Sequence, residues 1–335
     1  MDARNPRGVT SALPASWIGI VCLIEGQWAT RTLNSLDVIQ QRRLLFHVRI
    51  LSKLWKIFSG NEMGALLGWW LLKQYRNKPE EISPHDVYFI ASIVSSKMLK
   101  TIAEAEGCQF VETLTGFKWM GNTTLLLAKE GKLPLFAFEE AIGYMCSHRV
   151  PDKDGVSAAV QVASLASELY SNGSSLNDQL QALYARYGYH VSHNSYYICH
   201  DPHVIQKIFR RIRNYHGPGV YPNKLGSFEI ISIQDFAAGV TVPDEDVKPK
   251  HDLNALGTGL DGIYTGGEMV MLRCANGLSA TVRTSGTEPK IKYYTELVTR
   301  ADTPQDQEKV REMLVDMVDE VIDELLQPKE NGLVG

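Results

Sequence analysis

Cysteine is scarce and widely scattered in this chain of 335 residues. The five cysteines are Cys22, Cys108, Cys146, Cys199 and Cys274, an odd number with no C-x-x-C pair among them. This spacing predicts neither a disulfide framework nor a zinc ribbon. We therefore expect a reducing compartment, the cytosol.

An excess of basic residues is also missing. The chain has 34 Lys and Arg against 38 Asp and Glu, which gives a formal net charge of −4. It therefore has no overall positive charge to neutralise a nucleic-acid backbone, and we expect no nucleic-acid partner. Any anion that it binds must be held by a local cluster of donors.

Long hydrophobic runs are absent near the start of the chain. The longest there, Trp17–Ile24, ends at Glu25 and is far shorter than the roughly 20 residues that span a bilayer. We predict no membrane segment. Arg4 and Arg7 loosely imitate a secretory signal, but no small-residue cleavage site follows cleanly. We interpret residues 1–55 as an atypical, disordered leader.

The composition that remains is typical of soluble globular proteins, with 44% hydrophobic and 21% charged residues. The length allows about two domains. Hydrophobic patterning predicts a helix at 61–76, and then strands and helices in alternation. The predicted strands are 86–94, 109–113 and 133–138, and the predicted helices are 95–107, 118–132, 156–170 and 175–188. Strands that alternate with helices predict an α/β layer.

The pattern changes after an alternating run at 190–198, and a second domain is predicted to begin near His200. Two helices and four β-rich runs follow. The predicted helices are 204–214 and 304–326, and the runs are 227–236, 268–274, 278–284 and 290–298. Ala275-Asn276-Gly277 is a good hairpin turn because Asn and Gly tolerate positive φ. We expect an α+β module with an antiparallel sheet, and a long exposed loop over Gly239–Gly267.

The most informative motif is Arg283-Thr-Ser-Gly-Thr-Glu-Pro-Lys290, which lies between two predicted strands. Its arginine offers a planar fork of donors, its hydroxyls add neutral donors, and Gly286 lets backbone N–H groups approach an oxyanion. These properties favour phosphate binding. Composition alone leaves an ordinary hydrophilic hairpin as the alternative.

This motif closely resembles the phosphate-binding loop in the last domain of the α-D-phosphohexomutases. Four further segments resemble that family in order along the chain: Ser59–Glu62, Leu114–Lys118, Phe138–Gly143 and Asp152–Gly155. The strings KWMGN, FEEAIGYMC and KDGVSAAV are most similar to the phosphoglucomutase branch that also acts as a phosphopentomutase. The sister branch, glucose-1,6-bisphosphate synthase, is nearly as similar.

The resemblance implies the C-terminal half of such an enzyme. Residues 56–80 would be a remnant helix of the family's second domain. A mixed-sheet α/β sugar-binding domain would span 81–199, and a smaller α+β phosphate-binding domain would span 200–328. The unfamiliar first 55 residues suggest a truncated or alternatively spliced product.

The resemblance also implies two groups of ligand-binding residues. They are Arg283, Ser285, Gly286 and Thr287 for the phosphate, and Thr115, Gly116, Glu139 and Glu140 for the sugar. A carboxylate has two oxygens that can accept hydrogen bonds from adjacent ring hydroxyls, although by themselves Glu139 and Glu140 would be an exposed acidic pair. Lys153 matches a lysine close to the reacting phosphate, an electrostatic helper; alone it would be a surface lysine. Ala141 stands where many members have serine, which leaves one sugar contact in doubt.

Two functional strings of the family do not occur in this chain. They are the T-A-S-H-N-P loop that carries the phosphorylated serine and the D-x-D-x-D-R loop whose aspartates hold magnesium. We therefore assign no catalytic nucleophile and no metal ligand here. Ser192-His-Asn-Ser195 superficially resembles the serine loop, but it lacks the proline and lies in a strand-like run, so we do not interpret it as a nucleophile.

Two further patterns are weaker. Gly257-Thr-Gly-Leu-Asp-Gly262 fits a dinucleotide fingerprint as a string, but no strand precedes it and no helix follows, so we predict a loop. Two histidine pairs have i, i+3 spacing: His190 with His193, and His200 with His203. Such a pair can bind a metal ion only if it lies on a helix and a third ligand is present. We predict core or surface histidines.

The sequence thus predicts an isomerase of the phosphohexomutase family. Its partners would be sugar phosphates and bisphosphates: glucose 1-phosphate and 6-phosphate, or ribose and deoxyribose 1-phosphate and 5-phosphate. This chain, a monomer, would supply recognition without the phosphoserine or the magnesium site of the complete enzyme. The alternatives are a non-enzymatic sugar-phosphate-binding fragment and a fragment of a bisphosphate synthase.

Overall fold

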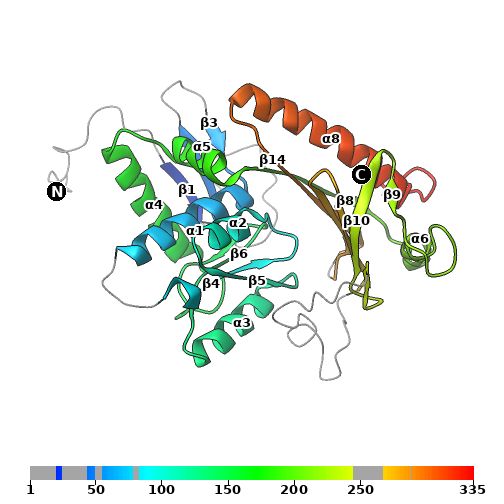
Figure 1. Cartoon of the computed structure of the whole chain (residues 1–335), viewed down its shortest axis with the longest axis horizontal. Coiled ribbons are helices and arrows are strands. Elements are labelled where there is room, and N and C mark those ends of the chain that lie inside the picture. The colour runs from blue at the N-terminus through cyan, green and yellow to red at the C-terminus, as the bar shows by residue number, and fades with distance from the viewer. Residues whose placement is uncertain (1–19, 25–43, 50–54, 78–82, 244–266, 287) are drawn as a thin grey trace, which may run out of the picture.

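A computed structural model describes residues 20–24, 44–49, 55–77, 83–243, 267–286 and 288–335. Figure 1 shows an α/β unit and a C-terminal sheet side by side, joined through β8 (Tyr189–Ile198). Within the predicted leader, β1 (Ile20–Ile24) and β2 (Leu44–Arg49) are antiparallel strands that form a three-stranded sheet with β3 (Trp55–Ile57). The rest of that leader lies outside the described residues.

The α/β unit is built on a four-stranded sheet in the order β5-β4-β6-β7. Its strands are β4 (Val87–Ser92), β5 (Gln109–Thr113), β6 (Leu133–Glu139) and β7 (Gly143–Met145), and the turn η1 (Pro84–Asp86) precedes them. β4 is parallel to β5 and β6, while β7 is antiparallel to β6. The predicted mixed sheet is confirmed. All six residues of β4 are buried, which is why its sequence is a continuous apolar run.

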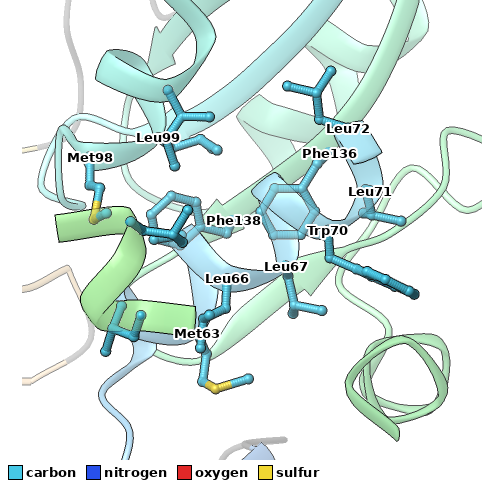
Figure 2. Packing of buried hydrophobic residues seen from close by; sticks show 14 of the residues in the cluster. Met63, Leu66, Leu67, Trp70, Leu71, Leu72, Met98, Leu99, Phe136 and Phe138 are labelled. Atoms are coloured by element: carbon cyan, nitrogen blue, oxygen red, sulfur yellow. The ribbon is translucent and has the colours of Figure 1, made fainter. Parts of the chain in front are cut away.

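Helices cover both faces of this sheet. They are α1 (Gly60–Arg76), α2 (Met98–Ala105), α3 (Phe117–Lys129), α4 (Gly155–Ser171) and α5 (Leu176–Tyr187). Because strand side chains alternate between faces, Phe89 packs with α1, α2, α4 and α5, whereas Tyr88 and Ile90 pack with α3. Figure 2 shows Leu66, Leu67 and their neighbours against Phe136 and Phe138 in the larger core.

Helix α1 lies unusually close to the sheet. It begins with a capping box formed by Ser59 and Glu62. A Cβ atom at Gly64 would lie 2.5 Å from the Phe138 ring, and one at Gly68 would lie 2.3 Å from Leu99. These glycines permit the close approach. The sequence associated this helix with a preceding domain, and the structure packs it into the core of the α/β unit.

The C-terminal unit is an antiparallel sheet in the order β11-β10-β12-β13-β14-β8, with β9 paired to β10. Its further strands are β9 (Lys224–Leu225), β10 (Phe228–Asp235), β11 (Val240–Val242), β12 (Met269–Cys274), β13 (Leu278–Thr284) and β14 (Lys290–Thr299). Helices α6 (Pro202–Arg213) and α8 (Pro304–Leu326) share its hydrophobic core. The predicted α+β module is confirmed.

Strand β8 belongs to the C-terminal sheet, whereas the sequence predicted it in the sugar-binding domain. The sequence assigned 190–198 to the sugar-binding domain, with the boundary near His200. In the structure β8 pairs with β14 along its whole length, from Tyr189 opposite Thr299 to Ile198 opposite Lys290. An alternating pattern reveals a strand but not the sheet that the strand joins.

The structure contains the hairpin turn that the sequence predicts at Ala275–Gly277. The hairpin between β12 and β13 contains Gly277 at a φ of 90°, and a Cβ there would lie 2.7 Å from the Val298 carbonyl oxygen. Of the predicted loop 239–267, the described residues 240–242 form β11, and residues 244–266 lie outside the described residues.

An ion cluster around the buried Asp235 connects α6 to the C-terminal sheet. Arg213, the last residue of α6, donates to both carboxylate oxygens of Asp235, over 2.7 and 3.1 Å, and also pairs with Glu268. The Tyr221 hydroxyl donates to Asp235 over 3.0 Å. The Asp235 side chain is completely buried, so its charge depends on these donors.

Candidate functional site

The predicted sugar-binding residues lie at one edge of the α/β sheet. Thr115 and Gly116 follow β5, and Glu139 and Glu140 stand at the end of β6. The carboxyl ends of parallel strands meet at the same edge, where ligands bind in open α/β sheets. Gly116, the N-cap residue directly before α3, has a φ of 107°, so the turn requires a residue that tolerates positive φ.

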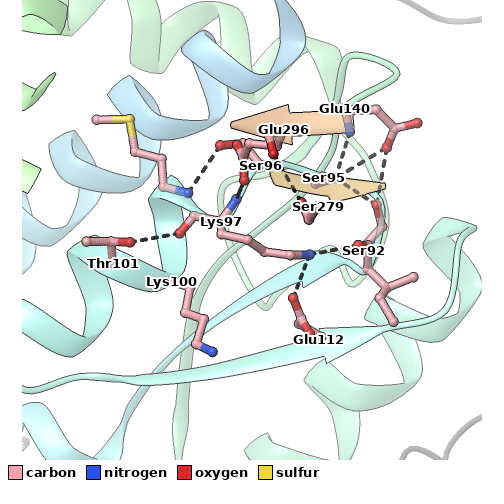
Figure 3. Close-up of polar contacts among 12 residues, drawn as sticks. Ser92, Ser95, Ser96, Lys97, Lys100, Thr101, Glu112, Glu140, Ser279 and Glu296 are labelled. Carbon is pink, nitrogen blue, oxygen red and sulfur yellow. Dashed lines mark hydrogen bonds and ion pairs between the residues drawn. The ribbon is translucent and has the colours of Figure 1, made fainter. Parts of the chain in front are cut away.

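Glu140 is held by two serines that the sequence analysis did not single out (Figure 3). Its Oε2 accepts hydrogen bonds from the hydroxyls of Ser92, over 3.2 Å, and Ser95, over 3.3 Å. Its backbone N–H donates to Ser95 Oγ over 3.0 Å. Burial and the nearby Glu139 charge raise the pKa of Glu140 above its ordinary value.

Glu139 has a different environment. Its Oε1 accepts from Lys153 Nζ over 3.0 Å, and its side chain crowds Gly143, where a Cβ would lie 2.8 Å from Glu139 Cγ. The lysine predicted to assist the reacting phosphate thus orients one of the two sugar-loop carboxylates in this structure.

The predicted phosphate loop connects β13 to β14. Arg283 Nη1 donates to the Thr284 carbonyl over 3.2 Å, and Nη2 lies 3.5 Å from the Tyr294 hydroxyl. The Arg283 guanidinium also lies 5.8 Å from the centre of the Tyr294 ring, and its Nε is buried with no hydrogen-bond partner in the described part of the chain. A buried donor without a partner is costly, so this arginine is suited to an added acceptor.

Space surrounds Gly286 in the same loop. Ser285 N donates to the Lys290 carbonyl over 2.9 Å, whereas a Cβ at Gly286 would meet no atom within 4 Å. Thr287, the fourth predicted phosphate ligand, lies outside the described residues. Glu288 is paired with Lys290 over 2.9 Å and with Lys292 over 3.5 Å, and the Lys290 contact is the main cause that lowers the pKa of Glu288.

The sugar residues and the phosphate loop meet at the interface of the two units. Ile93, Val94 and Leu114 pack with Met269 and Met271 in one apolar cluster, with Tyr294 and Trp119 against it. The positive charge of Arg283 acts on the Glu140 carboxyl. The phosphate-loop arginine and a sugar-loop carboxylate are therefore close enough for their charges to interact.

Polar contacts also connect the two units. Lys97, in the turn between β4 and α2, donates its backbone N–H to Glu296 Oε2 of β14 over 2.9 Å. Its ammonium pairs with Glu112 Oε1 over 2.6 Å. Burial opposes ionisation of Glu112, but Lys97 holds its pKa below the ordinary value. Asn61 of α1 adds a link, because its side chain donates to Ser192 Oγ of β8 over 3.1 Å.

The resemblance to the serine loop falls within a paired strand of the C-terminal sheet. Ser192–Ser195 lie within β8, where Asn194 Oδ1 accepts from Thr295 N over 3.0 Å. Within the described ranges no cluster of three His, Cys, Asp or Glu side chains could hold a metal ion, and no helix is long and apolar enough to span a bilayer. Gly257–Gly262 lie outside those ranges.

Ser92, Ser95 and Tyr294 are the site residues that sequence reasoning missed. A signal for the serines existed, since Ser92 ends the buried run of β4 and Ser95 and Ser96 come shortly after it, and the carboxyl ends of such strands carry functional groups. No local pattern marks Tyr294, because its position beside Arg283 depends on the pairing of β13 with β14.

Comparisons with known proteins agree on one family. Residues 59–187 match the phosphoglucomutase/phosphomannomutase α/β/α domain III. The chain is 48% identical to human phosphopentomutase over 280 residues, or 83% of this chain and 44% of that protein. It is 43% identical to human glucose 1,6-bisphosphate synthase over 281 residues, or 84% and 43%. It therefore spans less than half the length of these relatives.

A solved structure supports the fold. The phosphoglucomutase pp63/parafusin of Paramecium, in its open form, superimposes with a TM-score of 0.57 at 15% identity, over 85% of this chain and 44% of that one. At this identity the likeness shows the shared fold alone.

Proposed function

Because the chain belongs to the α-D-phosphohexomutase superfamily, with relatives in the phosphopentomutase and glucose-1,6-bisphosphate synthase branches, we propose that it binds a sugar phosphate between its two units. The phosphate would lie at Arg283, Ser285, Gly286 and Thr287, and the sugar at Thr115, Gly116, Glu139 and Glu140. The observation that carries this proposal is the Arg283 Nε, which is buried at the interface of the two units and has no hydrogen-bond partner among the described residues.

The proposed role of this chain is recognition. An isomerase of this family moves a phosphoryl group between two positions of a sugar, which requires a group that accepts it and charges that stabilise it in transit. Arg283 and Lys153 offer positive charge. The described residues contain no cluster that fits the family's magnesium, and we derive no step through a metal.

A second candidate is a sugar-phosphate-binding protein without enzymatic turnover. The observation that favours it is the absence from the 335 residues of both the T-A-S-H-N-P and the D-x-D-x-D-R strings. The two candidates share one binding site and differ in whether the ligand is converted.

Replacing Arg283 by Ala tests the phosphate half of the site. Each charge-assisted hydrogen bond contributes about 1.5–3 kcal/mol, so glucose 1-phosphate should bind roughly 10- to 150-fold more weakly, while any affinity for free glucose changes little. Titration calorimetry measures both. Arg300→Ala, which removes an exposed arginine, is the matched control. Equal losses for the two ligands, or a loss in the control, would contradict the proposal.

The Glu139→Gln/Glu140→Gln double variant tests the sugar half. Gln keeps the size but removes the charge and one acceptor oxygen from each side chain. Discrimination between glucose 1-phosphate and ribose 1-phosphate should fall, while affinity for inorganic phosphate survives, because specificity depends on polar contacts that only one ligand satisfies. The exposed Glu130→Gln serves as control. Unchanged discrimination in the double variant would show that the sugar-loop assignment is wrong.

A further inference from the structure

The turn between β4 and α2, residues 92–97, lies between the two halves of the site. One side of the turn carries Ser92 and Ser95, which contact Glu140, and the other side carries Lys97, which contacts the C-terminal sheet (Figure 3). No part of this turn belongs to the residues that the proposed function uses to bind the ligand. Its contacts nevertheless determine where one of those residues points.

Three oxygens form a closed triangle at the inner side of the turn. Ser92 Oγ and Ser95 Oγ are 2.7 Å apart, and each lies within 3.3 Å of Glu140 Oε2. Ser92 and Ser95 have exposed fractions of only 1% and 3% as whole residues, so water has little access to these hydroxyls. The two serine hydroxyls have two protons between them, for three oxygen–oxygen contacts. When Glu140 is ionised, both protons can be donated to its Oε2.

This arrangement leaves the second oxygen of Glu140 for another partner. No side chain in the described ranges donates a hydrogen bond to Oε1, whereas Oε2 accepts from both serines and the backbone N–H of Glu140 donates to Ser95. The Glu140 carboxylate is therefore held in one orientation before any ligand arrives. A ligand hydroxyl then meets a preorganised acceptor, which lowers the cost of ordering on binding.

The outer side of the turn is also anchored. Lys97 Nζ donates to the Ile93 carbonyl over 2.7 Å and pairs with Glu112, and Lys97 N donates to Glu296. Ile93 N donates to the Thr113 carbonyl over 2.8 Å. Because a supporting residue positions another group only when its own location is restrained, these contacts let the turn act as a rigid base.

We propose that Ser92 and Ser95 are positioning residues for sugar specificity, which they determine by holding Oε2 of Glu140 so that Oε1 faces the ligand. This rests on the proposed function, in which Glu140 accepts a hydrogen bond from the sugar. The serines touch no ligand atom and act through the carboxylate alone.

Other charged or titratable groups that act on Glu140 are Glu139 from its own loop, Arg283 from β13 and Tyr294 from β14. Glu139 is paired with Lys153. None of them changes when the serines are replaced. A hydrogen bond to the ionised carboxylate lowers the pKa of Glu140, so removal of the serine hydroxyls should raise that pKa further.

The first experiment needs no ligand. The carboxyl carbon of Glu140 is followed by NMR during a pH titration of the full chain, in the parent and in Ser92→Ala, Ser95→Ala and the double variant. We expect the midpoint to move to higher pH in each, most in the double variant. Ser164→Ala, which removes an exposed hydroxyl of α4, should leave it in place. A midpoint that is unchanged in both single variants overturns the proposal even if the double variant does not fold.

The second experiment measures specificity. The ratio of affinities for glucose 1-phosphate and ribose 1-phosphate should change by about tenfold in the double variant, the scale of one hydrogen bond to a charged group, while inorganic phosphate binds as before. In a Glu140→Gln background the same serine substitutions should have no further effect on the ratio. A full additional effect in that background would overturn the proposal. If the serine variants shift the Glu140 titration but the parent binds no sugar phosphate, the positioning contacts stand and the proposed function fails.

Discussion

The 335-residue polypeptide, purified alone, is expected to show no mutase turnover with glucose 1-phosphate, magnesium and added glucose 1,6-bisphosphate. The covalent route in this family needs a serine in its own loop, and neither that loop nor the aspartate string that holds a divalent cation occurs in the sequence. Binding by the sugar and phosphate groups also stabilises the ground state, so it cannot replace interactions made only in the transition state.

The assay compares conversion with a blank that contains no protein, and a full-length relative in the same buffer is the positive control. Mass spectrometry searches the chain for phosphoserine after incubation with the bisphosphate. Ser192 and Ser195 are the first residues to check, because they lie in the stretch Ser192-His-Asn-Ser195 that superficially resembles the missing loop. Enzyme-like turnover, or stoichiometric phosphoserine at either position, would refute this expectation and make β8 part of the catalytic machinery.

Arg213→Ala is expected to destabilise the C-terminal unit by about 3–5 kcal/mol, the usual cost when one partner of a buried ion pair is removed. The variant would leave the completely buried Asp235 carboxylate with the Tyr221 hydroxyl and the Ala238 backbone N–H as donors. Urea unfolding at constant pH, combined with hydrogen exchange of β10 and β12, measures the loss where it arises.

Two further variants separate charge from packing in the same cluster. Arg213→Met with Asp235→Leu removes the Arg213–Asp235 pair and leaves the partly exposed Glu268 to water. It should recover much of the lost stability, since well-packed apolar residues often replace a buried pair without cost. Arg300→Ala removes an exposed arginine and should change stability little. An Arg213→Ala variant as stable as Arg300→Ala would mean that the Asp235 charge does not depend on Arg213.

Part-buried hydrogen bonds connect the two halves of the proposed site. Glu296 has an exposed fraction of 6% and reaches from β14 to the start of α2, while Asn61 reaches from α1 to Ser192 and accepts from Ser96 N over 2.9 Å. These links put the phosphate loop and the sugar carboxylates on one framework. Under the proposed function, a ligand that carries both a phosphate and hydroxyls would contact both units at once.

The sequence by itself determined where the helices, strands and turns form and which loops are rich in hydrogen-bond donors. The apolar run that became β4, the hairpin at Ala275–Gly277 and the donor-rich stretch from Arg283 are all local signals. Periodicity, positive-φ residues and side-chain chemistry are properties of neighbouring residues, so they are readable without a fold. The resemblance to the phosphohexomutases rested on the same local strings.

Only the tertiary structure decided which distant residues meet. The strand β8 could have joined either sheet, and its pairing with β14 depends on packing between segments about a hundred residues apart. Likewise, Ser92 and Ser95 are 48 and 45 residues from Glu140 in the chain. Such contacts form because the carboxyl ends of parallel strands gather at one edge and because buried polar groups must find partners there. Neither condition leaves a pattern in the sequence around a single residue.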